Sequence, residues 1–149
     1  MQNFVELLKD HALIVSATKS LTGITRSAAA DAEAAFASLR HLARLLDNHL
    51  RAEAEFIRSE NHFGKGDFAA LAEQHGERFD DLVEEWGTYL LDWTQENISA
   101  DWATFAAATS RIVGRLIEQI EAENQSLYPA ALRYGLIRLL PEKVRASAN

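Results

Sequence analysis

Polar side chains that can bind metal interrupt stretches of the sequence that are otherwise apolar. His49 and Glu53 stand four residues apart, as do Gln119 and Glu123. Residues four apart lie on one face of a helix, so each pair can direct both side chains to one point. Burying ionised carboxylates is costly unless a cation or hydrogen bonds compensate for the lost water. We therefore predict a metal site, and its candidate ligands are His11, His49, Glu53, His75, Gln119 and Glu123.

The order of these residues repeats along the chain. In each half a single histidine comes first and a pair with i,i+4 spacing follows, in the stretches HLRAE (49–53) and QIEAE (119–123). Each half is thus expected to be a helical hairpin that contributes one ligand from its first helix and two from its second. The sequence contains no cysteine, so any metal must be held by nitrogen and oxygen atoms.

Four segments show large apolar residues spaced by three and then four positions, which is the period of a helix with one buried face. The first helix is predicted over about residues 3–21, with Gly23 ending it. The second follows a small, polar stretch at 25–32 and ends near Glu60, and a glycine-rich loop occupies 61–66. Thr18, on the first inner stripe, is expected to hydrogen-bond to the carbonyl four residues earlier.

The third helix is predicted to begin at Asp67, as N-cap, and to stop near Asn97. Ser99 is the expected N-cap of the fourth helix, which Pro129 should kink or end. Thr109 lies on the inner stripe of this helix, and we expect its hydroxyl to bond back to the backbone as that of Thr18 does. The remainder, to residue 149, is predicted to be a short tail.

No segment has the pattern of a strand, and short loops favour antiparallel neighbours. We expect an all-α fold, an antiparallel up-and-down four-helix bundle with a short C-terminal tail, as one domain over 1–149 with its core at roughly 3–133. At about 1.5 Å rise per residue, most of the candidate ligands lie at similar depths. His11 and His49 agree less well, at about 15 and 23 Å from the helix ends that flank the first loop.

Composition narrows the partners. With 149 residues, 48% hydrophobic and 25% charged, the chain can bury a core as a single domain. A net charge of -7 disfavours binding to nucleic acid or to anionic membrane surfaces. Charged residues interrupt the apolar residues of the N-terminus, and no stretch has the length of a membrane span. We expect a cytoplasmic protein without nucleic-acid or membrane partners.

The ordered set of residues resembles the hemerythrin-like, or HHE cation-binding, family over roughly residues 5–133. Members of that family have a histidine in helix one, His-x-x-x-Glu in helix two, a histidine in helix three, and a second His-x-x-x-Glu in helix four followed by Leu-Phe/Tyr-Pro. The matching positions here are His11, His49 with Glu53, His75, Gln119 with Glu123, and Leu127-Tyr128-Pro129.

The resemblance implies a non-haem di-iron centre bridged by the two glutamates, with His11 and His49 on one iron and His75 and residue 119 on the other. Here position 119 is glutamine, and an amide oxygen is a poorer ligand than imidazole for a transition metal. We therefore expect an asymmetric centre of one or two iron ions. In it, His11, His49, Glu53 and Glu123 hold one metal, while the site beside His75 is weak, empty or filled by another ion.

Three functions are consistent with these residues. The leading interpretation is a module that binds or senses dioxygen, a related small molecule, or iron and redox state. An enzymatic alternative is a di-iron oxidase or a protein of nitrosative-stress repair. The third is a metal-free interaction bundle whose buried polar groups satisfy one another. The stripe of Trp86, Tyr89, Trp93 and Trp102 is expected to be core, and it is also consistent with a homodimer surface.

Overall fold

The computed structural model describes residues 3–57 and 67–140, and over these residues the chain is all-helical apart from its turns and one isolated β-bridge. The helices are α1 (Phe4–Thr25), α2 (Ala32–Ile57), α3 (Asp67–Asp92), α4 (Gln95–Ala100), α5 (Trp102–Ala122) and α6 (Tyr128–Arg133). A π-helical turn, η2 (Glu123–Leu127), joins α5 to α6. The expected end of the second helix near Glu60, the loop at 61–66 and the tail at 141–149 lie outside the described residues.

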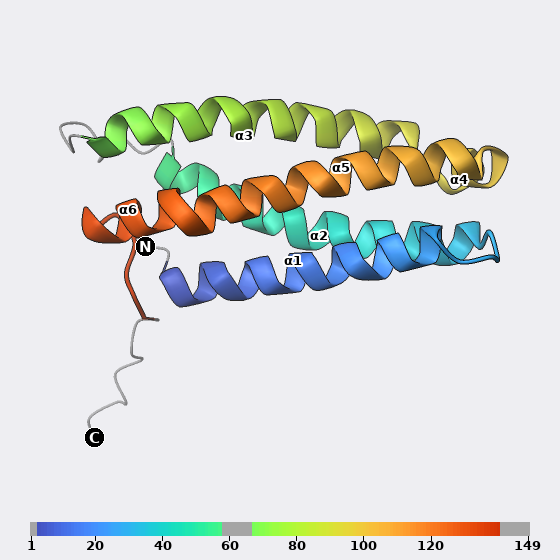
Figure 1. Ribbon diagram of the computed structural model, residues 1–149, viewed down its shortest axis with the longest axis horizontal. Helices are drawn as coiled ribbons and strands as arrows, with labels where there is room; N and C mark the ends of the chain where they lie inside the picture. Colours follow the sequence, from blue (N-terminus) through green and yellow to red (C-terminus); the bar gives the residue numbers. More distant parts are fainter. Residues whose placement is uncertain (1–2, 58–66, 141–149) are drawn as a thin grey trace, which may run out of the picture.

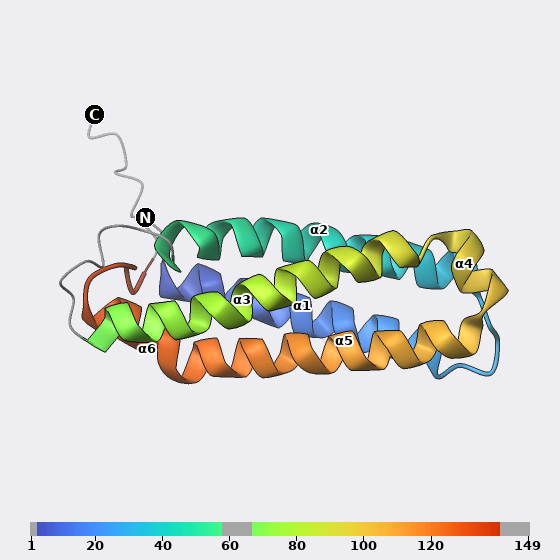
Figure 2. The same cartoon turned by 90° about the horizontal axis from the view of Figure 1, so that it is seen from above.

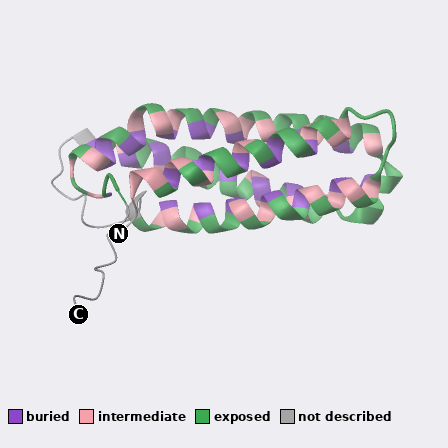
Figure 3. Ribbon diagram, turned by 90° about the horizontal axis from the view of Figure 1, so that it is seen from below, coloured by how far each residue is buried: buried purple, intermediate pink, exposed green. Residues whose placement is uncertain are grey.

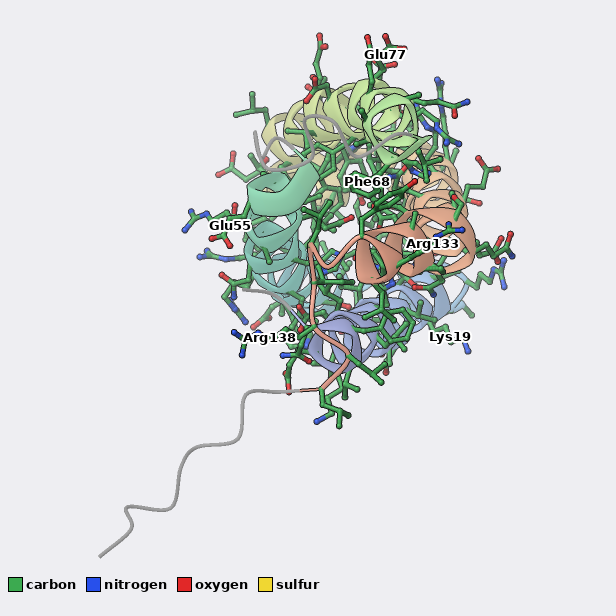
Figure 4. All side chains as sticks on the ribbon, turned by 90° about the vertical axis from the view of Figure 1, so that its left-hand side faces the viewer. Lys19, Glu55, Phe68, Glu77, Arg133 and Arg138 are labelled. Carbon is green, nitrogen blue, oxygen red and sulfur yellow. The ribbon has the colours of Figure 1, made fainter. Side chains whose placement is uncertain are left out.

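The long helices α1, α2, α3 and α5 lie side by side along a common axis, and successive ones run in opposite directions (Figures 1 and 2). The short helix α4 turns the chain at one end, and α6 lies at the other. Buried positions gather on the inner faces of the helices (Figure 3). Viewed along the axis, Lys19 and Glu77 point outward, whereas Phe68 points between the helices (Figure 4). In the described part of the chain, no helix has an apolar stretch long enough to cross a lipid bilayer.

The predicted end of the first helix was wrong. Gly23 lies inside α1, which continues to Thr25. A single glycine costs a helix only about 1 kcal/mol, and buried residues such as Leu21 hold this stretch against the core. The four extra residues place His11 about 21 Å from the end of α1, and His49 lies about 26 Å from the start of α2. The longer helix therefore brings the two histidines closer to the same level along the bundle.

The predicted boundary between the third and fourth helices was also wrong. The third helix ends at Asp92, and Ser99 lies within α4 rather than at an N-cap. Asp101 caps α5 instead, since its carboxylate accepts a hydrogen bond from the backbone N–H of Thr104 at 3.1 Å. Both residues are of types that favour N-caps, so composition alone does not distinguish them.

Helical structure continues through Pro129, because the chain passes from α5 through the π turn into α6. The α-helix stops at Ala122, the π turn follows, and Pro129 occupies the first turn of α6. Proline has no backbone N–H, so one hydrogen bond to the carbonyls of the preceding turn is missing at this position. Gly135, with φ at 73°, then turns the chain so that Arg138 accepts a hydrogen bond from the N–H of Phe4.

Two apolar clusters form the described core. One centres on residues such as Ile14, Leu42 and Leu116, and the other contains Leu7, Phe68 and Tyr128. On α1 the two clusters are represented by Leu7 and Ile14, and His11 lies between them. His11 thus occupies a zone with apolar packing on both sides.

Candidate metal centre

Four of the six predicted ligands meet in this zone. They are His11, His49, Glu53 and Glu123, and each offers one ligand atom such that all these atoms lie within 4.8 Å of one another. None of the four residues is more than 2% exposed. The site thus combines two imidazoles and two carboxylates out of contact with bulk water.

Three elements position these side chains. His11 comes from the middle of α1, and His49 and Glu53 lie one turn apart on α2. Glu123 is the first residue of the π turn that follows α5. The i,i+4 spacing on α2 brings His49 Nε2 to 2.7 Å from Glu53 Oε2, as expected for neighbours on one helix face.

Both imidazole rings turn Nε2 toward the same point. His11 donates through Nδ1 to Asn124 Oδ1 at 2.7 Å, which leaves Nε2 facing inward. His49 Nδ1 faces Asp10 Oδ2 at 3.4 Å. The two Nε2 atoms lie 2.9 Å apart. Partners on the outer nitrogen fix the ring orientation of metal-binding histidines, so this arrangement suits metal binding.

The distances between donor atoms are those expected around one ion. Adjacent ligands of an octahedral ion with bonds of about 2.1 Å are about 3.0 Å apart, and opposite ligands are about 4.2 Å apart. His11 Nε2 lies 3.0 Å from Glu123 Oε1, and His49 Nε2 lies 3.9 Å from that same oxygen. A single ion could therefore contact these atoms with small movements of the side chains.

The charges in this cluster are strongly coupled. Burial and the nearby Glu123 raise the pKa of Glu53 well above its usual value. Burial alone would also raise the pKa of Glu123, but hydrogen bonds with Glu53, His11 and His49 outweigh it and hold the pKa low. Burial disfavours the charged form of His49, yet both glutamates together raise its pKa to about 10. Without metal, these shifts in pKa favour the ionised form of Glu123, the neutral form of Glu53 and the protonated form of His49.

One atom in the cluster has no polar partner. Glu53 Oε1 is buried and makes no hydrogen bond. An unsatisfied buried oxygen costs free energy, and a bound cation would remove this cost. The donor set and this oxygen both fit a metal ion.

Comparisons with protein-family models, curated proteins and solved structures found no match to this chain. The hemerythrin-like resemblance therefore stays a prediction from the residues themselves.

The two remaining predicted ligands do not join the group of four. Gln119 donates through Nε2 to Glu123 Oε2 at 2.8 Å, so its amide orients that carboxylate. His75 Nε2 lies 3.0 Å from Ser126 Oγ, which itself donates to the carbonyl of Ala122 and must therefore accept from His75. His75 Nδ1 is buried without a hydrogen-bond partner. Burial and the charge of Arg78 lower the pKa of His75, which favours its neutral form.

The sequence did not identify the partners that orient the site. Asp10, Asn124 and Ser126 were not predicted to take part, and Tyr128 entered only as part of the family signature. Tyr128 Oη lies 3.0 Å from His11 Nε2 and 3.2 Å from His49 Nε2. The adjacent Pro129 was the only sequence signal of altered helix geometry at this place.

Proposed function

We propose that this protein is an antiparallel four-helix bundle of the hemerythrin-like kind that binds one non-haem iron ion through His11, His49, Glu53 and Glu123. The observation that supports it is the convergence of two imidazole nitrogens and two carboxylates in a dry interior. Ionisable residues are rarely buried in such numbers unless they are paired or bind metal.

Donor chemistry guides the choice of metal. Imidazole and carboxylate ligands suit iron, manganese and zinc, and the family resemblance selects iron among them. Iron, when bound, supplies redox chemistry and the capacity to bind small molecules. A surface depression of about 420 Å³ reaches His11, and Lys19, Ile120 and Asn124 also line it. A small ligand can thus approach the edge of the site, which supports a role in binding or sensing dioxygen, a related molecule or iron itself.

The proposal is for one ion rather than two. The amide of Gln119 is engaged with Glu123, and His75 donates from Nε2 to Ser126. A second ion would have to displace the amide nitrogen and draw on a neutral amide oxygen. We therefore propose that the second iron position of the hemerythrin-like pattern binds no iron in this protein.

A metal-free interaction bundle is the second candidate, and one observation favours it. With Glu53 and His49 protonated, most polar atoms of the cluster have hydrogen-bond partners without any ion. Protons would then compensate the buried negative charge, as a cation does in the first proposal. Direct measurement of metal distinguishes the two.

The test is elemental analysis of protein produced in iron-replete medium, with matched histidine variants. We expect about one iron per wild-type chain, almost none in His49→Gln, and about one in His75→Gln. Both substitutions replace a buried imidazole with an amide, so general damage to the core should affect both alike. A wild type without metal, or equal loss in the two variants, would overturn the proposal and favour the metal-free bundle.

A further inference from the structure

The hydroxyl of Tyr128 lies among the proposed ligand atoms. Its side chain is fully buried, and its oxygen is within 3.2 Å of both inward-facing imidazole nitrogens. The ring stacks on His11, with centroids 5.0 Å apart, and meets Phe4 edge to face. Packing thus fixes the ring with its oxygen toward the site.

The π turn explains why this oxygen reaches the site. In an α-helix, residues five apart point in directions about 140° apart, so Glu123 and the residue at 128 would face different sides. Here the backbone N–H of Tyr128 donates to the carbonyl of Glu123, five residues earlier. The wider turn places both side chains on the inner face. Such π segments often occur at functional sites.

We propose that Tyr128 is a fifth protein ligand, which binds ferric iron through its phenolic oxygen; this inference rests on the proposed metal site. The distances from Oη to the two Nε2 atoms match the separation of about 3.0 Å expected for adjacent ligands of one ion. An ion bonded to both nitrogens therefore lies within reach of the hydroxyl. Binding would replace the O–H bond of Tyr128 with an oxygen–iron bond, and the protons on Tyr128, Glu53 and His49 Nε2 would pass to solvent.

Phenolate ligation would make the site prefer ferric to ferrous iron. An anionic oxygen is a hard donor that stabilises ferric over ferrous iron. With Glu53 and Glu123, it would supply three anionic oxygens, which balance a trivalent ion in a buried place. The site is then suited to retaining oxidised iron, which specifies the redox state that the protein would bind or report.

A simpler role for Tyr128 is a hydrogen bond to His11 or Glu53, and the two roles differ in what they predict. A tyrosine that only donates to His11 or Glu53 leaves no optical signature when iron binds. A phenolate bonded to ferric iron gives a charge-transfer band in the visible spectrum, with phenolate ring vibrations in the resonance Raman spectrum. The spectrum therefore distinguishes Tyr128 as a metal ligand from Tyr128 as a hydrogen-bond partner of the ligands.

The experiment titrates metal-free protein with ferric nitrilotriacetate and follows both spectra, while zinc binding is measured separately by calorimetry. In the wild type we expect the band to saturate at about one equivalent, with vibrations that shift when the tyrosines are ring-deuterated. In Tyr128→Phe we expect the band to vanish and the Kd for ferric iron to rise at least about tenfold. Tyr89→Phe, which alters another buried tyrosine, should behave as the wild type.

The outcomes separate this inference from the proposed function. Iron bound by the wild type without the band, or an unchanged band in Tyr128→Phe, would overturn Tyr128 as a ligand and leave the four-residue site standing. Failure of the wild type to bind either ferric iron or zinc would overturn both. The deuterium shift is measured on wild-type protein, so it decides the question even if Tyr128→Phe does not fold.

Discussion

In the hemerythrin-like pattern that we propose for this chain, Gln119 stands where a histidine would help to bind a second ion. Its amide instead donates to Glu123 Oε2 at 2.8 Å, and so it helps to hold that carboxylate toward His11. If the proposed site binds metal, Gln119 therefore orients one of its ligands without offering an imidazole for a second ion. His75, whose Nδ1 is buried without a hydrogen-bond partner, matches the other histidine that this pattern assigns to the second ion.

Replacing this amide should change the number of ions bound. In Gln119→His we expect iron content to rise from about one to about two per chain, because an imidazole is a stronger ligand than an amide and His75 has a nitrogen available. Elemental analysis of purified protein measures the change. Gln119→Leu, which removes the amide and adds no ligand, should remain at about one. An unchanged iron content in Gln119→His would contradict the expectation.

At the scale of helices, the apolar period predicted which faces are buried better than it predicted where helices end. His11, His49, Glu53 and Glu123 were placed on inner stripes, and all four are buried. The ends were missed because Gly23 weakens a helix without having to stop it, and because Ser99 and Asp101 are both suitable N-caps.

The π turn could not be predicted from the apolar pattern. A stripe at 100° per residue contains no sign of one extra residue in a single turn. Leu127 fits the same stripe whether the turn is α or π, and Pro129 shows only that one backbone donor is missing. The position of Tyr128 at the site, and the roles of Asn124 and Ser126, follow from that turn and were therefore missed.

Thr109 provides a test of how α3 and α5 are joined. Its hydroxyl was expected to bond to its own helix, but it lies 2.6 Å from Tyr89 Oη on α3. Removing the Tyr89 hydroxyl leaves Thr109 buried without that partner, so Tyr89→Phe should lower the free energy of unfolding by about 1 kcal/mol at neutral pH. Chemical denaturation of both proteins measures the difference.

The same hydrogen-bonded pair predicts a response to alkaline pH. Burial raises the pKa of Tyr89 from 10.0 to about 12, although the hydrogen bond with Thr109 opposes the shift. Between these values the folded protein retains a proton that the unfolded chain releases, so stability is complete below pH 10 and falls as the pH rises toward 12. The wild type should therefore lose more stability over this interval than Tyr89→Phe. Tyr134→Phe is the control, and it should lose as much stability as the wild type over this interval. If the free energy of unfolding fell equally with pH in all three proteins, the raised pKa of Tyr89 would be refuted as the cause.

For the whole molecule, the proposed site joins segments that are distant in the chain. Its ligands come from α1, α2 and the π turn after α5, so unfolding any of these elements destroys it. A ligand that binds only the folded protein stabilises it by about 2.7 kcal/mol when its concentration is about 100 times the Kd. For a chain of this size each kcal/mol raises Tm by about 2–4 °C, so saturation with iron should raise Tm by about 5–10 °C.

The contribution of the metal can be separated from that of the side chains with two glutamine variants on α2. Because the raised pKa of Glu53 favours its neutral form without metal, we expect Glu53→Gln to change the charge of the metal-free cluster little and to leave the Tm of the chelator-treated protein nearly unchanged. The substitution removes an anionic ligand, however, so the increase in Tm on adding iron should largely disappear. Glu55→Gln, an exposed change two residues away, should keep the full increase. Thermal melts of all three proteins, with and without chelator, measure these differences. If iron raised the Tm of Glu53→Gln as much as that of the wild type, the stabilising ion would bind at a place other than the buried carboxylates.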